Sequence, residues 1–332
     1  MAFQILALSG GGFLGLYSAA VLAEVEKVSA RPVAESFDLL AGTSIGGIIA
    51  LGLAAGKSAA EIQCAFEQHG QKIFSKRPPP TTSLGSFRDL LRATFSSKYK
   101  AEALRETVAA IVGPDTRIGD LKRPVIVPAV NLTKGKPQIF KTPHHPDFRF
   151  DLNLKVVDVA LATAAAPTYF PLAEIEDSLF ADGGLYANSP DILALHEATH
   201  FFKVREDVVK ILSVGTTTAQ FSFGHSKSTR FGIADWFRGQ RLMNVIISSQ
   251  QKSVDYMLRH RLGGRYVRLD AAQSKEQERI LGLDVATVAA QKTIRALAAA
   301  TAQESISDAM LQDMLRYDAP SPRFYHGRET GN

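Results

Sequence analysis

The sequence contains a single cysteine in 332 residues. Cys64 has no partner within the chain, which excludes an intramolecular disulfide bond. It falls in a helical pattern over residues 59–74, and free cysteines are among the most often buried side chains. We therefore expect Cys64 to be buried without a chemical role, in a protein of the reducing cytoplasm.

Long hydrophobic runs are also missing. A membrane span needs about 18 uninterrupted apolar residues, and the closest stretch, residues 156–173, is broken by Asp158 and two prolines. The first residues lack the basic stretch that opens a signal peptide. We expect a soluble, cytoplasmic protein that meets a membrane only at its surface.

What is present is an ordinary globular composition, with 45% hydrophobic and 21% charged residues. Strand patterns at residues 3–8, 124–130 and 208–214 alternate with helical patterns, and no repeat or linker is visible. This alternation predicts an α/β fold, with helices on both faces of a mostly parallel central sheet. We expect one domain over residues 1–317 and a flexible tail over 318–332.

Two segments depart from this regular pattern. Residues 75–100 begin with three prolines and interleave basic with apolar side chains, which fits a lid or interfacial segment, or equally a long surface connection. Residues 225–268 hold nine Lys or Arg against two Asp, in a chain of net charge +5. This basic helical segment can attract lipid or nucleotide phosphates, or it can be a solvated helix face.

One serine stands at a sharp turn between elements. An apolar strand pattern ends at Gly42, a helical pattern begins at Ile45, and the sequence between Gly42 and Gly46 is Gly-Thr-Ser-Ile-Gly. This is the Gly-x-Ser-x-Gly arrangement of a nucleophile elbow, in which glycines allow the close backbone approach that the turn requires. Ser44 is therefore a candidate nucleophile. The alternative is a glycine-rich turn with an incidental serine.

A row of glycines follows the first strand. Gly10, Gly11 and Gly12 precede a helical pattern, so their N–H groups form an anion site at a helix N-terminus. With Gly15 they also satisfy the dinucleotide fingerprint, which needs an acid at the end of the second strand. Asp38 has about the right spacing but opens a strand instead. The serine elbow favours the other interpretation, an oxyanion hole.

An acid at a strand end completes the set of candidates. Asp182 follows a short strand and precedes Gly183 and Gly184, as expected of a catalytic acid at the carboxyl edge of a parallel sheet or of a simple turn aspartate. A serine needs a base, most often histidine. Four histidines follow Asp182, so a Ser-His-Asp triad stays open: His196, His200, His225 and His260. The pair His144-His145 lacks further ligands, and we expect no metal.

These three motifs, together with the small-residue run that ends at Pro171, resemble the patatin-like phospholipases in order and spacing. The resemblance implies a three-layer α/β/α fold and hydrolysis of lipid acyl esters by a Ser–Asp dyad without histidine. Ser44 is then the nucleophile, Asp182 takes its proton, and Gly10, Gly11 and Gly12 form the oxyanion hole. The implied partners are membrane phospholipids at the inner face of the membrane, with no cofactor, DNA or RNA.

A narrower resemblance lies in the start at residues 8–12, in the lead-in Phe37-Asp38-Leu39, and in the segments 131–137 and 140–144. These are similar to bacterial patatin-like effectors of cyclic-oligonucleotide antiphage defence. It implies a cyclic dinucleotide activator such as cyclic GMP-AMP, through contacts that the sequence does not identify, and it favours a homo-oligomer. The alternatives are an unregulated esterase with a triad, a nucleotide-binding oxidoreductase using the loop from Gly10 to Gly15, and a non-catalytic lipid-binding module.

Overall fold

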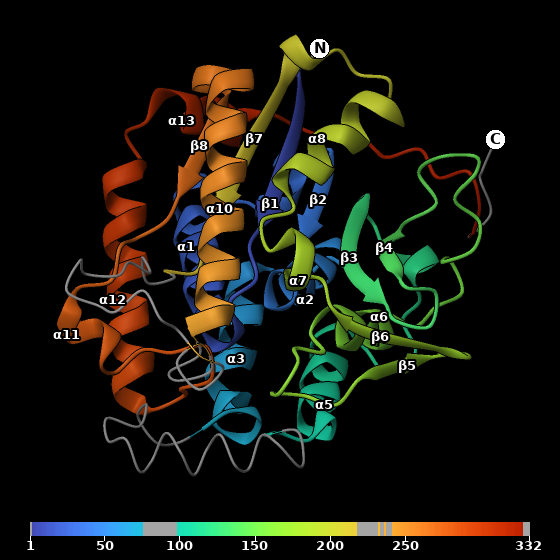
Figure 1. Cartoon of the computed structure of the whole chain (residues 1–332). Coiled ribbons are helices and arrows are strands. Elements are labelled where there is room, and N and C mark those ends of the chain that lie inside the picture. The colour runs from blue at the N-terminus through green and yellow to red at the C-terminus, as the bar shows by residue number, and fades with distance from the viewer. Residues whose placement is uncertain (1, 76–97, 218–231, 233–235, 237–240, 328–332) are drawn as a thin grey trace.

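The computed structural model describes residues 2–75, 98–217, 232, 236 and 241–327 (Figure 1). Its centre is an eight-stranded sheet of order β5-β6-β3-β2-β1-β7-β8, in which β4 also pairs with β3. The strands are β1 (Phe3–Leu8), β2 (Leu39–Gly42), β3 (Val125–Asn131), β4 (Lys136–Lys141), β5 (Ala173–Ile175), β6 (Ser178–Asp182), β7 (Val209–Val214) and β8 (Tyr266–Leu269).

The sheet is parallel from β3 through β2, β1 and β7 to β8, and antiparallel where β4, β5 and β6 are added. All six residues of β1 are buried, as expected for an apolar strand at the centre of a parallel sheet. The predicted α/β fold is therefore confirmed, with a mixed sheet whose antiparallel part the sequence pattern did not reveal.

Helices cover both faces of the sheet (Figure 1). Leu6 and Leu8 of β1 lie in a core shared with α1, α2, α3, α5, α6 and α12, whereas Ile5 and Ala7 lie in a second core with α8 and α10. This alternation follows from the two-residue period of a strand. The longer helices are α1 (Gly15–Ser29), α2 (Ile45–Ala54), α3 (Ala59–Ile73), α5 (Ala101–Val112), α6 (Val156–Thr163), α8 (Asp191–His200), α10 (Arg241–Leu262), α12 (Val288–Ser305) and α13 (Ala309–Arg316), and the short ones are α7 (Gly184–Ala187) and α11 (Lys275–Glu278).

Several predicted features lie partly outside the described residues or differ from what the structure shows. Residues 76–97 of the expected lid lie outside the described residues, as does most of 225–240, so the basic helical segment is seen as α10 and β8. Residues 318–327 of the expected tail contact the domain: Ala319 N–H donates to Glu35 O and Tyr325 N–H to Pro143 O. Cys64 is exposed, so the expectation of a buried cysteine is wrong. None of the described helices is long and apolar enough to span a membrane.

The strand β3 brings two loops together. β4 occupies one edge of β3 from Ile126 to Asn131. The other edge is shared: β2 runs parallel along Val125 and Ile126, and β6 runs antiparallel along residues 129–131. The ends of β2 and β6 therefore approach each other from opposite directions. Asp182, paired with Ala129, lies there and not at the carboxyl edge of a parallel strand, which corrects the reason given for its position.

Candidate active site

Ser44 occupies the turn between β2 and α2. Its backbone has φ 55° and ψ −124°, a strained conformation that a serine rarely adopts and that occurs most often at functional turns. The flanking glycines are required by space: a Cβ on Gly42 would lie 2.1 Å from Gly46 O, and one on Gly46 would lie 2.3 Å from Leu8 O. The turn therefore has the geometry expected of a nucleophile elbow.

The Ser44 hydroxyl faces the carboxylate that ends β6. Ser44 Oγ donates a hydrogen bond of 2.7 Å to Asp182 Oδ2, and Gly184 N–H donates one of 2.6 Å to Asp182 Oδ1. Burial raises the pKa of Asp182 to about 6, against the lowering effect of these two hydrogen bonds. A Cβ on Gly183 would lie 2.3 Å from Pro128 O, so glycine is needed for the turn to pass β3. The two residues have the reach that proton transfer requires.

Thr163, at the end of α6, holds the elbow from the side. Its Oγ1 accepts the Ser44 N–H at 2.9 Å and donates to Pro128 O at 2.6 Å, and its carbonyl accepts Gly183 N–H at 3.2 Å. One buried residue thus ties Ser44 to β3 through its side chain and holds the Asp182 turn through its carbonyl. The sequence showed Thr163 only as part of a small-residue run, and no local pattern marked this role.

The glycine row lies beside Ser44. Gly10 N–H donates to Asn188 O at 2.9 Å, so it is already engaged. The N–H groups of Gly11 and Gly12 have no hydrogen-bond partner among the described residues, and both glycines line the same pocket as Ser44. Gly12 has φ +56°, and a Cβ there would lie 2.0 Å from Leu283 O. The free donors of the loop are therefore those of Gly11 and Gly12.

The last glycine of the first motif, Gly15, opens α1 against the elbow helix α2. A Cβ on Gly15 would lie 2.3 Å from Cγ1 of Ile45, the first residue of α2. Glycine at this position lets the helix after the glycine row and the helix after the serine approach each other. The packing explains why the two glycine motifs occur together.

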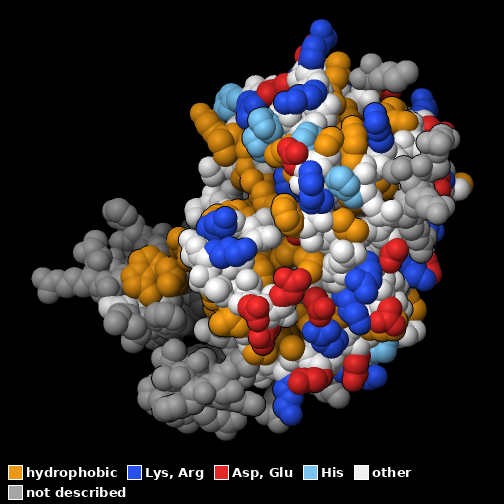
Figure 2. Space-filling view, turned by 90° about the vertical axis from the view of Figure 1, so that its right-hand side faces the viewer, with side chains coloured by type: hydrophobic (Ala, Val, Ile, Leu, Met, Phe, Trp, Pro, Cys, Tyr) orange, Lys and Arg blue, Asp and Glu red, His pale blue; other side chains and the backbone are white. Residues whose placement is uncertain are grey.

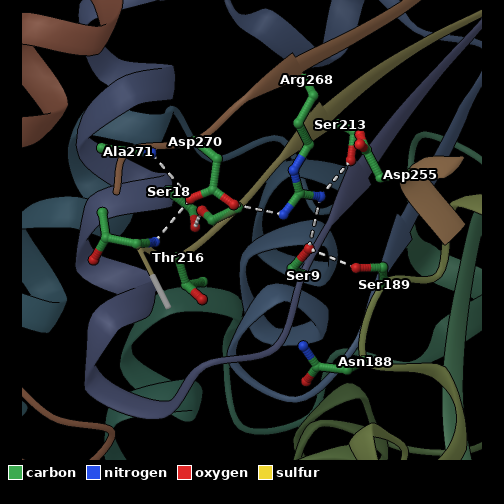
Figure 3. Close-up of polar contacts among 12 residues, drawn as sticks. Ser9, Ser18, Asn188, Ser189, Ser213, Thr216, Asp255, Arg268, Asp270 and Ala271 are labelled. Carbon is green, nitrogen blue, oxygen red and sulfur yellow. Dashed lines mark hydrogen bonds and ion pairs between the residues drawn. The ribbon is translucent and has the colours of Figure 1, made fainter. Parts of the chain in front are cut away.

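The largely buried guanidinium of Arg268 contacts the residue that precedes the glycine row (Figure 3). Arg268 of β8 donates to Ser9 Oγ at 3.1 Å and Ser213 Oγ at 2.7 Å, and pairs with Asp270 at 2.7 Å. Burial alone would lower the pKa of the Arg268 guanidinium. The carboxylates of Asp270 and Asp191 have a larger, opposite effect, so the pKa is raised. Ser9 directly precedes the glycine row, so Arg268 helps to fix where that row begins.

The pocket in front of Ser44 is mainly apolar and encloses about 710 Å³, its open mouth included. Its walls come from the small-residue run at residues 162–171, from α10 and from nearby aromatic side chains. The small-residue run therefore lines an apolar pocket. Besides Gly11, Gly12, Ser44 and Asp182, the lining residues are Ile45, Ile48, Phe74, Leu104, Ala164, Ala166, Pro167, Tyr169, Phe170, Gly184, Leu185, Asn188, Met243, Ile247 and Leu283. Such a pocket suits a hydrocarbon chain better than a polar ligand.

The histidines that a triad would use lie elsewhere. His196 and His200 stack on each other at 5.1 Å on the exposed side of α8, and His260 contacts Tyr256 on α10. Figure 2 shows histidine side chains on the surface among Lys and Arg. None of the described histidines lines the pocket, and His225 lies outside the described residues.

Asp38, considered above for binding a ribose, and His144, considered for binding a metal, form hydrogen bonds within the fold. Asp38, the candidate ribose acid, accepts Gln4 N–H at 2.7 Å and the Tyr317 hydroxyl at 3.2 Å. His144 contacts Thr142 and Glu197 through its two ring nitrogens. Within the described ranges, no group of three or more potential metal ligands occurs.

A serine on an elbow, a carboxylate in hydrogen-bond reach and free N–H groups beside an apolar pocket together form the arrangement of a serine ester hydrolase. The profile of a family described as "Patatin-like phospholipase" matches residues 6–195, and the chain belongs to this family of lipid ester hydrolases. The predicted family is confirmed, and the oxidoreductase alternative is not supported.

Three bacterial relatives carry the name "cGAMP-activated phospholipase". The protein of Pseudomonas aeruginosa is 43% identical over 98% of this chain and 95% of its own length. Those of Vibrio cholerae and Escherichia coli are 42% and 39% identical, over 80% and 86% of this chain and 81% and 84% of theirs. The similarity therefore extends beyond the family match, through α10 and β8.

Proposed function

We propose that the chain hydrolyses acyl ester bonds of membrane phospholipids through Ser44 and Asp182. The observation that carries this proposal is the 2.7 Å hydrogen bond from Ser44 Oγ to Asp182 Oδ2 beside an apolar pocket. The family membership supports the substrate class.

In the first half of the reaction, Ser44 Oγ attacks the ester carbonyl carbon while its proton moves to Asp182 Oδ2. The carbonyl oxygen becomes an oxyanion, which the N–H groups of Gly11 and Gly12 stabilise; one such donor is worth about 3 kcal/mol in other hydrolases. The intermediate collapses when the ester C–O bond breaks and the leaving alkoxide takes the proton from Asp182. The products of this half are an acyl-Ser44 enzyme and a lysophospholipid.

In the second half, water attacks the acyl carbon and Asp182 accepts its proton. The second tetrahedral intermediate collapses when the bond to Ser44 Oγ breaks, and Ser44 regains a proton from Asp182. A free fatty acid leaves. The carboxylate is a weaker base than imidazole, so its hydrogen bond to Ser44 and its raised pKa both matter to the rate.

We propose further that a cyclic dinucleotide such as cyclic GMP-AMP switches this activity on, and that the substrate lies at the inner face of the cytoplasmic membrane. The support is the name "cGAMP-activated phospholipase", which three relatives that cover most of the chain carry. The resemblance to antiphage effectors gives the activity a role in defence.

The test is fatty-acid release from vesicles of phosphatidylethanolamine and phosphatidylglycerol, with and without cyclic GMP-AMP. Ser44→Ala and Asp182→Ala should abolish release, whereas His196→Ala and His260→Ala should retain it. A fluorophosphonate probe should label Ser44 alone. An active Asp182→Ala together with an inactive histidine variant would contradict the dyad, and full activity without any nucleotide would contradict the switch.

A further inference from the structure

One polar side chain interrupts the apolar face that α10 turns toward the molecule. Met243 and Ile247 line the pocket, and Val254 and Leu258 are buried in the core beside the sheet. Gln250 stands between these pairs at the same helical spacing, where the pattern calls for an apolar residue. A polar group in such a place needs partners, and the structure supplies three.

The Gln250 amide places three hydrogen bonds on one short segment. Oε1 accepts Asn188 N–H at 2.9 Å, and Nε2 donates to Gly184 O at 3.1 Å and to Leu185 O at 3.2 Å. The amide orientation is fixed by its partners, since the reverse orientation would face donor with donor and acceptor with acceptor. A carboxylate could accept from Asn188 but could not serve the two carbonyls.

The segment held by Gln250 touches both halves of the active site. At its start, Gly184 N–H donates to Asp182 Oδ1 at 2.6 Å. At its end, Asn188 O accepts Gly10 N–H at 2.9 Å, and Asn188 Nδ2 donates to Gly10 O at 3.3 Å. Between these ends lies α7, which has only four residues and too few internal hydrogen bonds to be rigid alone.

We propose that Gln250 is a positioning residue that holds the base and the oxyanion loop in register with each other. It acts through Gly184 on Asp182 and through Asn188 on Gly10, so one side chain of α10 positions both the base and the start of the loop that carries Gly11 and Gly12. This inference rests on the proposed function. It assigns to α10 a role in catalysis beyond forming a wall of the pocket.

The test compares Gln250→Met and Gln250→Glu with Ser249→Ala. Methionine keeps the size of the side chain and removes all three hydrogen bonds, whereas glutamate keeps the acceptor and removes both donors. Ser249 is a matched control, because its exposed hydroxyl bonds only to Val245 O and Ile246 O of its own helix. Each variant is assayed on a soluble p-nitrophenyl ester between pH 5 and 9, with the cyclic dinucleotide present, and its melting temperature is measured.

The expected result is a fall in kcat of at least about tenfold for both Gln250 variants with little change in KM, since orientation contributes to the transition state more than to binding. The acid limb of kcat/KM should move to higher pH, because the Gly184 hydrogen bond lowers the pKa of Asp182. Among the described groups, only Ser44 and Gly184 oppose the effect of burial there, and no charged side chain contributes. The limb should move further in Gln250→Glu, which adds a negative charge, and should stay in place in Ser249→Ala.

Hydrogen exchange over residues 183–189 gives a readout that does not need activity. Exchange should be faster in Gln250→Met than in the wild type or Ser249→Ala. An unchanged kcat, acid limb and exchange rate would overturn the inference, and so would a loss of kcat that follows the melting temperature alone. If instead the wild type has no Ser44-dependent activity while exchange responds as expected, the proposed function fails and the positioning contact remains.

Discussion

The hydroxyl of Ser44 donates to the carboxylate of Asp182 across 2.7 Å, although the two residues are carried by strands that run in opposite directions. Both strands share one edge of β3, and the loops meet where the two strands end. The pair is therefore fixed by the sheet, and its chemistry is set by how deeply that meeting point is buried.

The first prediction concerns the pH dependence of hydrolysis. Asp182 must be ionised to accept the Ser44 proton, and burial raises its pKa to about 6. We expect kcat/KM to be constant above about pH 7 and to fall about tenfold per pH unit below pH 6. Stopped assays with a soluble ester, with circular dichroism to check folding at each pH, measure this. A half-maximal rate near pH 4 would show that burial does not perturb the carboxyl group.

The second prediction is that Asp182 reduces stability at the pH where it works. A carboxyl group with a raised pKa in the folded state favours folding below pH 3.8 and loses that contribution as the pH rises toward 6. The free energy of unfolding of the wild type should fall, relative to that of Asp182→Asn, by about 2 kcal/mol between pH 4 and 8. Urea titrations at the two pH values measure this difference.

The control for this stability measurement is Asp147→Asn, since the Asp147 side chain is 78% exposed. Its free energy of unfolding relative to the wild type should not change between the two pH values. Asp151, which is half-buried and has its pKa raised to about 6, is present in every variant, so its contribution cancels. Parallel pH dependence for the wild type and Asp182→Asn would contradict the prediction.

The third prediction concerns Thr163. Thr163→Val keeps the shape of the side chain but leaves Ser44 N–H and Pro128 O without their partner. We expect kcat to fall at least about tenfold and the free energy of unfolding by about 2 kcal/mol, because buried polar groups lose their hydrogen bonds. Thr163→Ser, which keeps the hydroxyl, should recover most of the activity. Equal activity of the two variants would show that the hydrogen bonds do not position Ser44.

The fourth prediction concerns the ion pair of Arg268 and Asp270, which contacts Ser9 just before the glycine row. Arg268→Gln leaves Asp270 without its charged partner and weakens the contact to Ser9. We expect a loss of about 1 kcal/mol in the free energy of unfolding, since solvent screens the partly exposed pair, and a lower kcat. The double variant Arg268→Gln with Asp270→Asn should recover part of the stability, since no uncompensated charge remains. Additive losses in the double variant would show that the two side chains do not interact.

The milder variant Ser9→Ala separates the positioning of the glycine row from the charge of the ion pair. It removes the hydroxyl that joins the glycine row to Arg268 but leaves the ion pair in place. We expect it to lower kcat with little effect on stability, as measured by ester hydrolysis and thermal unfolding. An unchanged kcat would place the role of Arg268 in folding alone.

The parts of the site that could be predicted are those encoded locally. The elbow at Ser44 and the glycine row are visible because close backbone approach demands glycine at fixed spacing. Asp182 was identified from its position before two glycines, although the direction of β6 was missed, because strand pairing is not written in the strand itself. Gln250 gave no signal, since its partners lie 62 or more residues away in sequence. Arg268 was visible only as one charge of the basic segment, since Ser9, its contact to the glycine row, lies 259 residues away.

The pairing of β6 with β3 has one more consequence. Side chains alternate between the two faces of a sheet, so a slip of β6 by a single residue would put Ala181 opposite Ala129 and turn the Asp182 carboxylate to the other face. Such a chain would keep its helices, its strands and most of its core, and would hydrolyse nothing. The rate of ester hydrolysis therefore reports whether β6 is paired with β3 in the correct register. Circular dichroism of secondary structure would not detect a slip of one residue.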